Sequence, residues 1–312
     1  MRTEASRGSF VASSHRVISL PVAAHVEPFR WQLDLFWFGH RQVYGREARL
    51  RTLAIVIKRN KIAEKKVGRM SWNIDVPHSM CEAFFDIEGI KGSVPSSRFG
   101  IGVPLNIQTG LMQILPKFSD EQLLEVIDCD MFHFRPCPVR NIRPYELIVS
   151  DVYENWHLFS LSKNRHIISP YFENKGRYYN GGFVPIIGLA ATFRRILPEW
   201  TAIHIDILRR DYGATIHWWA GMFALQAACE KARVQMIGRD FCYVPDVNTL
   251  TPNHYIGHYS VDHLFDKSKF PSIDHNEFPT NPYYQLITNW IRQRNSKIPK
   301  NFLRLPSPVK AG

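Results

Sequence analysis

The chain has 312 residues, of which 45% are hydrophobic and 21% are charged, a composition that is typical of a folded protein with a sizeable core. No run reaches the roughly eighteen consecutive apolar residues that a membrane helix needs, and residues 1–16 lack the apolar centre of a secretory signal. We therefore expect a cytosolic or nuclear protein without a membrane partner. The net charge of +11 favours acidic partners such as nucleic acid or a phosphate-bearing ligand.

Hydrophobic periodicity predicts strands and helices in alternation along the chain. The first half is predicted to hold a strand, a helix, a second strand parallel to the first, another helix and two further strands, at residues 17–25, 29–44, 53–57, 104–115, 123–127 and 146–149. The second half is predicted to hold a strand, two helices and a short strand, at residues 183–187, 190–209, 216–232 and 234–237. This alternation predicts an α/β fold with a mostly parallel central sheet, in which ligands bind at the carboxyl ends of the strands.

Both ends of the chain differ in composition from this alternating part. Residues 1–16 are rich in Ser, Arg and small residues and are predicted to form a disordered arm. Residues 273–312 are rich in Pro, Asn and Lys, and we expect them to lie along the surface as a tail rather than to form a second domain. Residues 17–272 then form one domain. The sequence contains neither an internal repeat nor a glycine-rich phosphate-binding motif.

Five cysteines are scattered along the chain without a Cys-x-x-Cys pair: Cys81, Cys129, Cys137, Cys229 and Cys242. An odd number with this spacing indicates neither a disulfide framework nor a structural zinc site. We therefore expect free thiols.

The strand predicted at residues 123–127 runs directly into Asp128 and Asp130. The two-residue period of an extended chain places both carboxylates on the same side, provided that the extended geometry continues past the strand. Two carboxylates can then hold one Mg²⁺ or Mn²⁺, because these cations accept oxygen ligands and are often completed by substrate phosphate. A simple polar turn after a strand is the alternative.

A second candidate group lies far downstream, in the segment Asn253-His-Tyr-Ile-Gly-His-Tyr259. Within it His258 is a candidate metal ligand, and Lys267 beyond it is a candidate contact of a diphosphate. A metal and a lysine together would neutralise the charge that develops on a departing nucleotide. A structural histidine in a short apolar segment is the alternative.

The bend before the strand predicted at residues 183–187 consists of Asn180, Gly181 and Gly182. Glycine adopts backbone conformations that are closed to other residues and lets the main chain approach a ligand closely. We therefore regard this bend as a candidate contact of a sugar, although Asn-Gly is also a common turn.

Four segments follow one another in the order found in A-type nucleotide-sugar glycosyltransferases. They are the strand ending in Asp128-Cys-Asp130, the segment Tyr179-Asn-Gly-Gly-Phe183, the helix with Trp218-Trp219, and Gly257-His258-Tyr259. Within this superfamily the chain resembles the base J DNA glucosyltransferases and their phage relatives, and more distantly the hydroxyproline and serine glycosyltransferases. The phrases that suggest the base J group are Pro28-Phe-Arg-Trp31, Glu125-Val-Ile-Asp-Cys-Asp-Met131 and Trp218-Trp-Ala-Gly-Met-Phe223.

This resemblance implies a Rossmann-like A-type glycosyltransferase fold, a divalent metal (Mn²⁺ or Mg²⁺) and a UDP-sugar donor, with glucose as the expected sugar. It implies that Asp128 and Asp130 touch the donor ribose and the metal, and that His258 completes the metal shell. It also places Asn106 and Gln108 near the nucleotide. The sequence gives no indication of an oligomeric state.

The sequence leaves the general base open. Inverting relatives often carry an acidic residue at the start of the helix predicted here at residues 216–232, where this chain has His217 and no carboxylate. His217 is one candidate, because an imidazole that titrates near neutrality suits the removal of a hydroxyl proton, and Asp151 after the strand at 146–149 is another. An enzyme that retains the anomeric configuration needs no such base.

The resemblance and the positive charge together favour hydroxymethylated DNA as the acceptor. The acceptor group is then the hydroxyl of 5-hydroxymethyluracil or 5-hydroxymethylcytosine, which lies in the major groove. Candidates for phosphate contacts occur in two basic segments: Lys58, Arg59, Lys61, Lys65 and Lys66, and Arg292, Arg294, Lys297 and Lys300. The alternatives are a protein glycosyltransferase acting on hydroxyproline or serine, for which a secretory signal and disulfides are expected, and a DNA-binding relative without activity.

Overall fold

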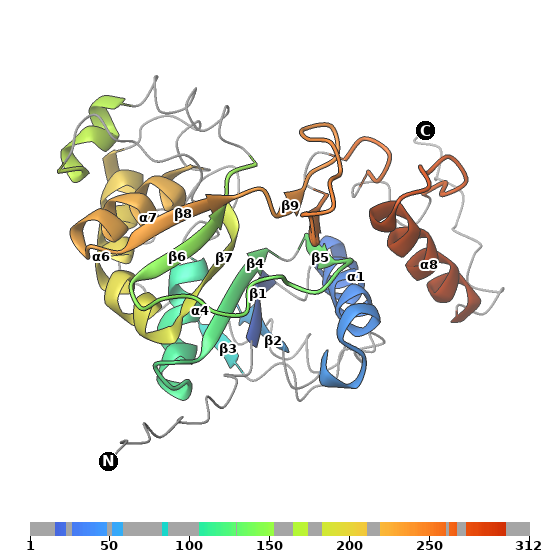
Figure 1. Cartoon of the computed structure of the whole chain (residues 1–312), viewed down its shortest axis with the longest axis horizontal. Helices are drawn as coiled ribbons and strands as arrows, with labels where there is room; N and C mark the ends of the chain where they lie inside the picture. Colours follow the sequence, from blue (N-terminus) through green and yellow to red (C-terminus); the bar gives the residue numbers. More distant parts are fainter. Residues whose placement is uncertain are drawn as a thin grey trace, which may run out of the picture.

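Figure 1 shows the chain as a computed structural model, which describes residues 16–22, 27–48, 52–58, 83–86, 106–128, 130–152, 165–173, 183–210, 219–259, 262–266 and 273–297. The main sheet has seven strands in the order β3-β2-β1-β4-β7-β6-β8. Their bounds are Arg16–Val22 (β1), Thr52–Lys58 (β2), Ala83–Asp86 (β3), Leu123–Asp128 (β4), Glu146–Ser150 (β6), Phe183–Leu189 (β7) and Gln235–Arg239 (β8).

All strands of the main sheet except β7 run in the same direction. β1 pairs in parallel with β2 and β4, β2 with β3, and β6 with β8, whereas β7 is antiparallel to both of its neighbours. The α/β class and the mostly parallel sheet that the sequence predicts are thereby confirmed. Because β4, β6 and β8 end at the same edge, the residues that follow them gather there, and β7 begins there.

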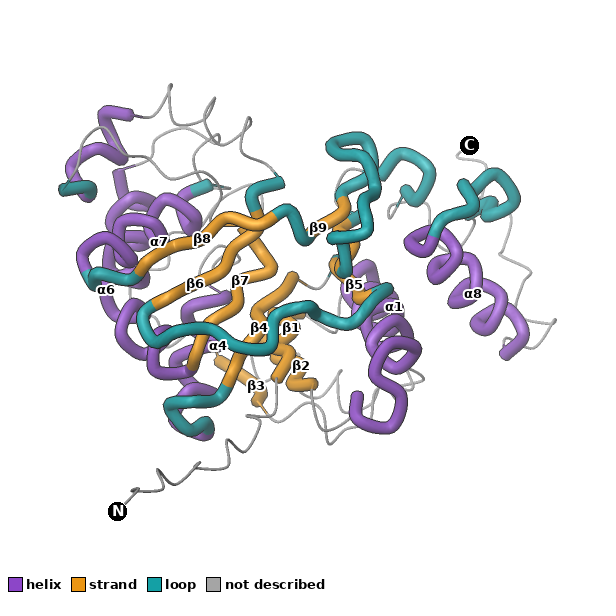
Figure 2. Tube along the Cα trace, viewed as in Figure 1, coloured by secondary structure: helices purple, strands orange, loops and turns teal. Residues whose placement is uncertain are grey.

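Helices lie on both sides of this sheet (Figure 2). α4, α6 and α7 gather on one side, whereas α1 lies on the other side with α8 beyond it. Their bounds are Glu27–Tyr44 (α1), Asn106–Ile114 (α4), Ala190–Arg210 (α6), Ala220–Lys231 (α7) and Pro282–Lys297 (α8). Short 3₁₀ turns occupy Gly45–Glu47, Leu115–Lys117 and Ser169–Tyr171.

Small side chains let α7 pack closely against α6. Its alanines are strong helix formers, and those that are buried against the core are Ala220, Ala224, Ala227 and Ala228. The indole Nε1 of Trp200 on α6 donates a 2.8 Å hydrogen bond to the carbonyl oxygen of Gly221 on α7. α7 begins at Ala220, four residues later than predicted, and residues 211–218 lie outside the described part of the chain.

A second sheet stands at the carboxyl edge of the main one. It has three strands in the order β5-β10-β9, with bounds Met131–His133 (β5), Cys242–Tyr243 (β9) and Ile256–His258 (β10). β5 follows β4 after a bend, and β9 follows β8, so the chain enters the small sheet twice from the carboxyl edge of the main sheet. This arrangement brings the residues after Asp128 next to those around His258.

The C-terminal tail contains the helix α8, which the sequence analysis missed. Tyr283, Ile287 and Trp290 of α8 are buried in an apolar cluster together with Trp31 of α1. The indole Nε1 of Trp290 also donates a 2.9 Å hydrogen bond to a carboxylate oxygen of Asp34 on α1. These buried positions recur at intervals of four and three residues, a helical spacing, but the surrounding Pro and Asn residues had suggested an irregular segment.

Two further expectations concern the chain ends and membranes. β1 begins at Arg16, so residues 1–15 of the predicted arm lie outside the described residues. Among the described helices none is long and apolar enough to cross a membrane.

Candidate metal centre

Two carboxylates and one imidazole converge at the carboxyl end of β4. Asp128, Asp130 and His258 each offer one ligand atom, and these three atoms all lie within 4.8 Å of one another. The Nε2 atom of His258 lies 3.1 Å from Oδ1 of Asp130, and the two side chains are only 3% and 15% exposed. In the described part of the chain, no other group of three His, Cys, Asp or Glu side chains has this arrangement.

A bend between the two sheets produces this convergence. Asp128 is the last residue of β4, and Met131 already belongs to β5 in the small sheet, so the extended geometry on which the sequence prediction relied ends here. β10 pairs antiparallel with β5 and places His258 opposite Met131. The N–H of Tyr259 donates a 3.2 Å hydrogen bond to the carbonyl oxygen of Asp130, which fixes the bend beside His258.

Gly257 allows β10 to approach α8 closely. A Cβ atom at this position would lie 2.5 Å from Cδ2 of Tyr283, closer than side-chain carbons pack in folded proteins. Any larger residue would push either the ring of Tyr283 or the strand out of place. The packing of α8 against β10 therefore helps to set the position of His258, the residue after Gly257.

The corner around the two aspartates has a negative electrostatic potential. Burial raises the pKa of the Cys242 thiol on β9 well above its ordinary value, and the negative charges of Asp240, Asp130 and Asp128 raise this pKa further. Without a cation the thiol therefore stays protonated at neutral pH. A divalent cation between the carboxylates would neutralise the potential that acts on this thiol.

The donor set fits the metals that the sequence analysis expects. Carboxylate oxygens suit both Mg²⁺ and Mn²⁺, whereas an imidazole nitrogen is a more usual ligand of transition metals. Two carboxylates with His258 therefore favour Mn²⁺ over Mg²⁺. Three protein ligands leave positions open for phosphate oxygens of a substrate.

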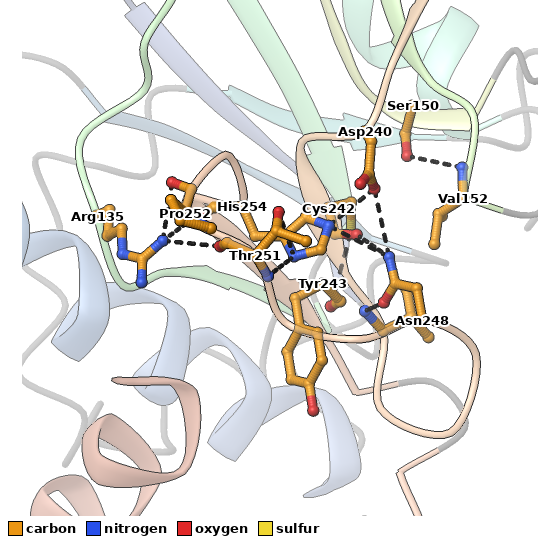
Figure 3. Close-up of polar contacts among 11 residues, drawn as sticks. Arg135, Ser150, Val152, Asp240, Cys242, Tyr243, Asn248, Thr251, Pro252 and His254 are labelled. Atoms are coloured by element: carbon orange, nitrogen blue, oxygen red, sulfur yellow. Dashed lines mark hydrogen bonds and ion pairs between the residues drawn. The ribbon is translucent and has the colours of Figure 1, made fainter. Parts of the chain in front are cut away.

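A hydrogen-bonded loop between β9 and β10 supports the centre (Figure 3). His254 is fully buried; its Nδ1 accepts a 2.8 Å hydrogen bond from the N–H of Thr251, and its Nε2 lies 2.8 Å from Oδ1 of Asp240. The guanidinium of Arg135 donates to the carbonyl oxygens of Thr251, Pro252 and His254. His254, the histidine of the motif that is not part of the metal centre, thus has a structural role: it orders the loop that leads to β10.

Asp151, one candidate base, lies at the same edge of the main sheet. It follows β6, and its N–H donates a 3.4 Å hydrogen bond to the carbonyl oxygen of Arg239 at the end of β8. Only β7 separates β6 from β4, and neighbouring strands lie about 4.8 Å apart, so the two strand axes are roughly 10 Å apart. A bound sugar could bridge this distance.

Several predicted contacts fall outside the described residues, namely Asn180, Gly181, Gly182, His217 and Lys267. β7 starts with Phe183 beside Ser150 of β6, at the carboxyl edge of the sheet, and Phe183 directly follows the first three of these residues in the sequence. Ala220 likewise begins α7 three residues after His217, and the roles of all five residues remain predictions.

The two residues predicted near the nucleotide belong to the first turn of α4. α4 leads through a 3₁₀ turn to the start of β4, so its N-terminus, at Asn106, points to the carboxyl edge of the sheet. Gln108 is buried, and its Nε2 lies 2.8 Å from Nδ1 of His204 on α6. Part of the Gln108 amide is therefore engaged within the protein, and its contact with a nucleotide remains a prediction.

The structure shows one polar group that the sequence analysis missed. Glu125 on β4 is completely buried and contacts His133 of β5 and Tyr255 next to β10. The sequence signal for this group was the carboxylate in the middle of the apolar strand Leu-Leu-Glu-Val-Ile. Charged residues are seldom fully buried without a partner, so this carboxylate indicates buried polar partners.

No family model matches the chain, and no curated protein matches it. Solved structures align with it, among them the following three. An active-site mutant of LgtC has 10% sequence identity and a TM-score of 0.47, over 92% of this chain and 98% of that chain. Mouse xyloside xylosyltransferase 1 has 12% identity and a TM-score of 0.42, over 79% and 97%. The bifunctional glycosyltransferase WbbM has 11% identity and a TM-score of 0.45, over 82% and 47%. All three TM-scores are below 0.5, so the function proposed below is based on the residues of this chain.

Proposed function

We propose that the chain is a metal-dependent glycosyltransferase of the A-type fold. It would move a sugar from a UDP-sugar to the hydroxymethyl group of 5-hydroxymethyluracil or 5-hydroxymethylcytosine in DNA. The observation that carries the proposal is the convergence of Asp128, Asp130 and His258 within 4.8 Å at the carboxyl end of β4. In open, mostly parallel α/β sheets this edge is where ligands bind.

Asp128, Asp130 and His258 are the residues that would hold the cation, with Mn²⁺ favoured by the imidazole. When bound, the metal would supply positive charge that stabilises the diphosphate leaving group. The protein orders its ligands in advance, because β5, β10 and the bend are joined by backbone hydrogen bonds. Lys267 is proposed to add a second positive charge at the diphosphate.

In the proposed reaction the acceptor hydroxyl oxygen forms a bond to the anomeric carbon, and the bond from that carbon to the diphosphate oxygen breaks. The hydroxyl proton passes to a base, and the nucleoside diphosphate leaves. Asp151, whose N–H donates to the carbonyl oxygen of Arg239 at the end of β8, is one proposed base, and His217 is the other. With retention of configuration, neither base is required.

The remaining candidate contacts surround the same edge. Asn106 and Gln108 are proposed to contact the nucleotide from the first turn of α4. Asn180, Gly181 and Gly182 are proposed to contact the sugar from the segment that leads into β7. The positive net charge of +11 and the resemblance to the base J group support DNA as the acceptor.

The test is a transfer assay on duplexes that each contain one modified base. Duplexes with 5-hydroxymethyluracil or 5-hydroxymethylcytosine are incubated with Mn²⁺ and a panel of nucleotide sugars, and the nucleosides are analysed by mass spectrometry. We expect the mass of one sugar residue to be added to the modified nucleoside. Duplexes with thymine or 5-methylcytosine, which lack the hydroxyl, are the matched control. Transfer to a hydroxyproline or serine peptide, with the duplexes unmodified at low salt, would instead identify a protein glycosyltransferase.

A further inference from the structure

We propose that Glu125 is a positioning residue for the metal centre, an inference that rests on the metal site of the proposed function. Its Oε1 atom lies 3.1 Å from Nε2 of His133 and accepts a 2.7 Å hydrogen bond from the hydroxyl of Tyr255. All three side chains are at most 2% exposed. Glu125, His133 and Tyr255 are called the buried triad below.

The buried triad joins the three segments that contain the metal ligands. Glu125 belongs to β4, which ends in Asp128, and His133 belongs to β5, which follows Asp130. Tyr255 immediately precedes β10, which ends in His258. One carboxylate oxygen therefore connects all three ligand-bearing segments.

The spacing within each segment is the same. Glu125 lies three residues before Asp128, His133 three residues after Asp130, and Tyr255 three residues before His258. The contact between Glu125 and His133 closes the bend between β4 and β5, so it sets the angle at which the two aspartates face each other. The carbonyl oxygen of Tyr255 also accepts hydrogen bonds of 3.0 and 3.1 Å from the N–H groups of Phe134 and Arg135, which fixes β10 against β5.

Both partners of Glu125 can donate a hydrogen bond to its Oε1 atom. Burial and the charge of Glu125 raise the pKa of Tyr255 well above its ordinary value, so its hydroxyl stays protonated and donates. With Nε2–H of His133 assigned as a donor to Glu125, Nδ1 of His133 faces Nδ1 of His40 at 3.4 Å. His40 extends the network to α1, which packs closely against β5 because Gly39 has no Cβ.

The fold alone gives no reason for a charge at this position. The other residues of β4 up to Ile127 are buried and apolar, and an apolar residue at position 125 would continue the core without the cost of burying a carboxylate. Groups that hold metal ligands in place from behind, without touching the metal, commonly set metal affinity. The buried triad has this relationship to Asp128, Asp130 and His258.

The experiment compares two tyrosines that make the same kind of hydrogen bond. Tyr255→Phe removes the 2.7 Å bond to Glu125. Tyr283→Phe removes a 2.7 Å bond from an equally buried tyrosine to Asp262, outside the buried triad, and keeps the ring that packs against Gly257. Glu125→Gln is the third variant and keeps the shape of the side chain while it removes the charge. The dissociation constant of Mn²⁺ is measured without donor by electron paramagnetic resonance of free Mn²⁺, and thermal unfolding is measured on the metal-free proteins.

We expect Tyr255→Phe and Glu125→Gln to weaken Mn²⁺ binding by about tenfold or more, and Tyr283→Phe to change it less than twofold. The unfolding temperatures of the two tyrosine variants should fall by similar amounts, because each loses one buried hydrogen bond. Wild-type affinity in Tyr255→Phe and Glu125→Gln would overturn the inference, and so would an equal loss of affinity in Tyr283→Phe. If Glu125→Gln does not fold, Tyr255→Phe decides alone. A wild-type protein that does not bind Mn²⁺ would instead refute the metal site of the proposed function together with this inference.

Discussion

The Nε2 atom of His258 lies 3.1 Å from Oδ1 of Asp130, although 128 residues separate the two along the chain. The contact exists because β10 pairs with the strand that begins just after Asp130. Since the two side chains share one corner, a cation held by Asp130 is also within reach of His258. Loss of either ligand should therefore impair the same site.

Asp130→Ala is expected to abolish turnover while the fold is retained. Loss of a direct metal ligand should cost several kcal/mol of transition-state stabilisation, which corresponds to roughly a thousandfold in rate. Initial rates of sugar transfer with Mn²⁺ measure turnover, and far-ultraviolet circular dichroism shows whether the fold is retained. Glu121→Ala, in the exposed turn before β4 and thus at the other end of this strand from Asp130, is the matched control and should keep wild-type activity. Full transfer activity in excess chelator would contradict the metal requirement.

Asp151→Asn and His217→Ala test the two candidate bases. Removal of the base should lower turnover by about a hundredfold or more with donor affinity little changed, because the base acts on the acceptor proton. Single-turnover rates and UDP-sugar binding constants separate the two effects. If both variants keep near-normal turnover, transfer with retention of the anomeric configuration is favoured. Nuclear magnetic resonance of the product then shows whether the configuration is inverted or retained.

Six of the seven strands of the main sheet were predicted from local hydrophobic patterns, whereas the short strand β3 was not predicted. The run Leu123 to Ile127 is apolar and contains β-branched residues, and the structure makes it the buried strand β4. The convergence of Asp128, Asp130 and His258 was also expected, but the physical reason differs. Two-residue alternation along one extended strand was the basis of the prediction for the two aspartates, whereas in the structure a bend into a second sheet brings the three side chains together.

Long-range packing explains what the sequence did not reveal. The small sheet joins β5, β9 and β10, three strands of two or three residues that are too short for a periodic pattern and are fixed by their partners. α8 was missed because Pro and Asn residues surround its helical pattern, and its apolar packing on α1, more than two hundred residues earlier, became visible only in the fold. Glu125 was visible as an anomaly in its strand, but its partners His133 and Tyr255 could be named only from the fold.

Gly257→Ala should destabilise the protein, whereas Gly238→Ala should not. The new Cβ at position 257 would lie 2.5 Å from the ring of Tyr283, but at position 238 the closest atom, Cβ of Asp151, is at an ordinary 3.4 Å. Overpacking of this kind costs about 1–3 kcal/mol of unfolding free energy. Both glycines lie in strands, so strand propensity changes equally in the two variants. Equal midpoints of chemical denaturation would contradict the close packing of α8 against β10.

The buried cysteines should resist alkylation in the native protein. Burial raises the pKa of Cys229 to about 12 and those of Cys137 and Cys242 well above the ordinary value. The reactive species is the thiolate, and at pH 9 a thiol with a pKa of about 12 is roughly 0.1% ionised, whereas a free thiol with a pKa of about 8.5 is mostly ionised. Peptide mapping after iodoacetamide treatment should find these three cysteines unmodified, and the same protein in guanidinium should be fully labelled.

The same pKa shifts give a sign for the pH dependence of stability. Above about pH 8.5 the unfolded chain loses thiol protons that the folded chain keeps, so the unfolding free energy should fall as the pH rises further. Replacing Cys229, the thiol buried among the alanines of α7, with Ala should make this alkaline decrease smaller. Denaturation midpoints from pH 7 to pH 10, for the wild type and Cys229→Ala, measure this decrease in unfolding free energy. An unchanged slope in Cys229→Ala would show that other groups cause the decrease.

The last prediction concerns the acceptor and the basic segment after β2. Each phosphate contact made by Lys or Arg releases counterions, so affinity for duplex DNA should fall steeply as salt rises, with a slope set by the number of contacts. Neutralising Lys61, Lys65 and Lys66 together should weaken binding to all DNA sequences about equally and reduce that slope, because phosphate contacts position a protein without reading bases. Fluorescence anisotropy of a labelled duplex over a salt series measures both effects.

The fold offers a control with the same change in charge. Lys117, Arg143 and Arg233 are exposed and lie two to six residues before β4, β6 and β8, at the amino edge of the sheet, opposite the metal centre. Their joint replacement by Gln removes three positive charges but should leave the salt slope near its wild-type value, provided that DNA lies at the carboxyl edge. Equal slopes in both triple variants would mean that only overall charge attracts DNA, without an oriented complex. Because the hydroxymethyl group and not the flanking sequence is proposed to determine transfer, duplexes of unrelated sequence with the same modified base should react at similar rates in the wild type.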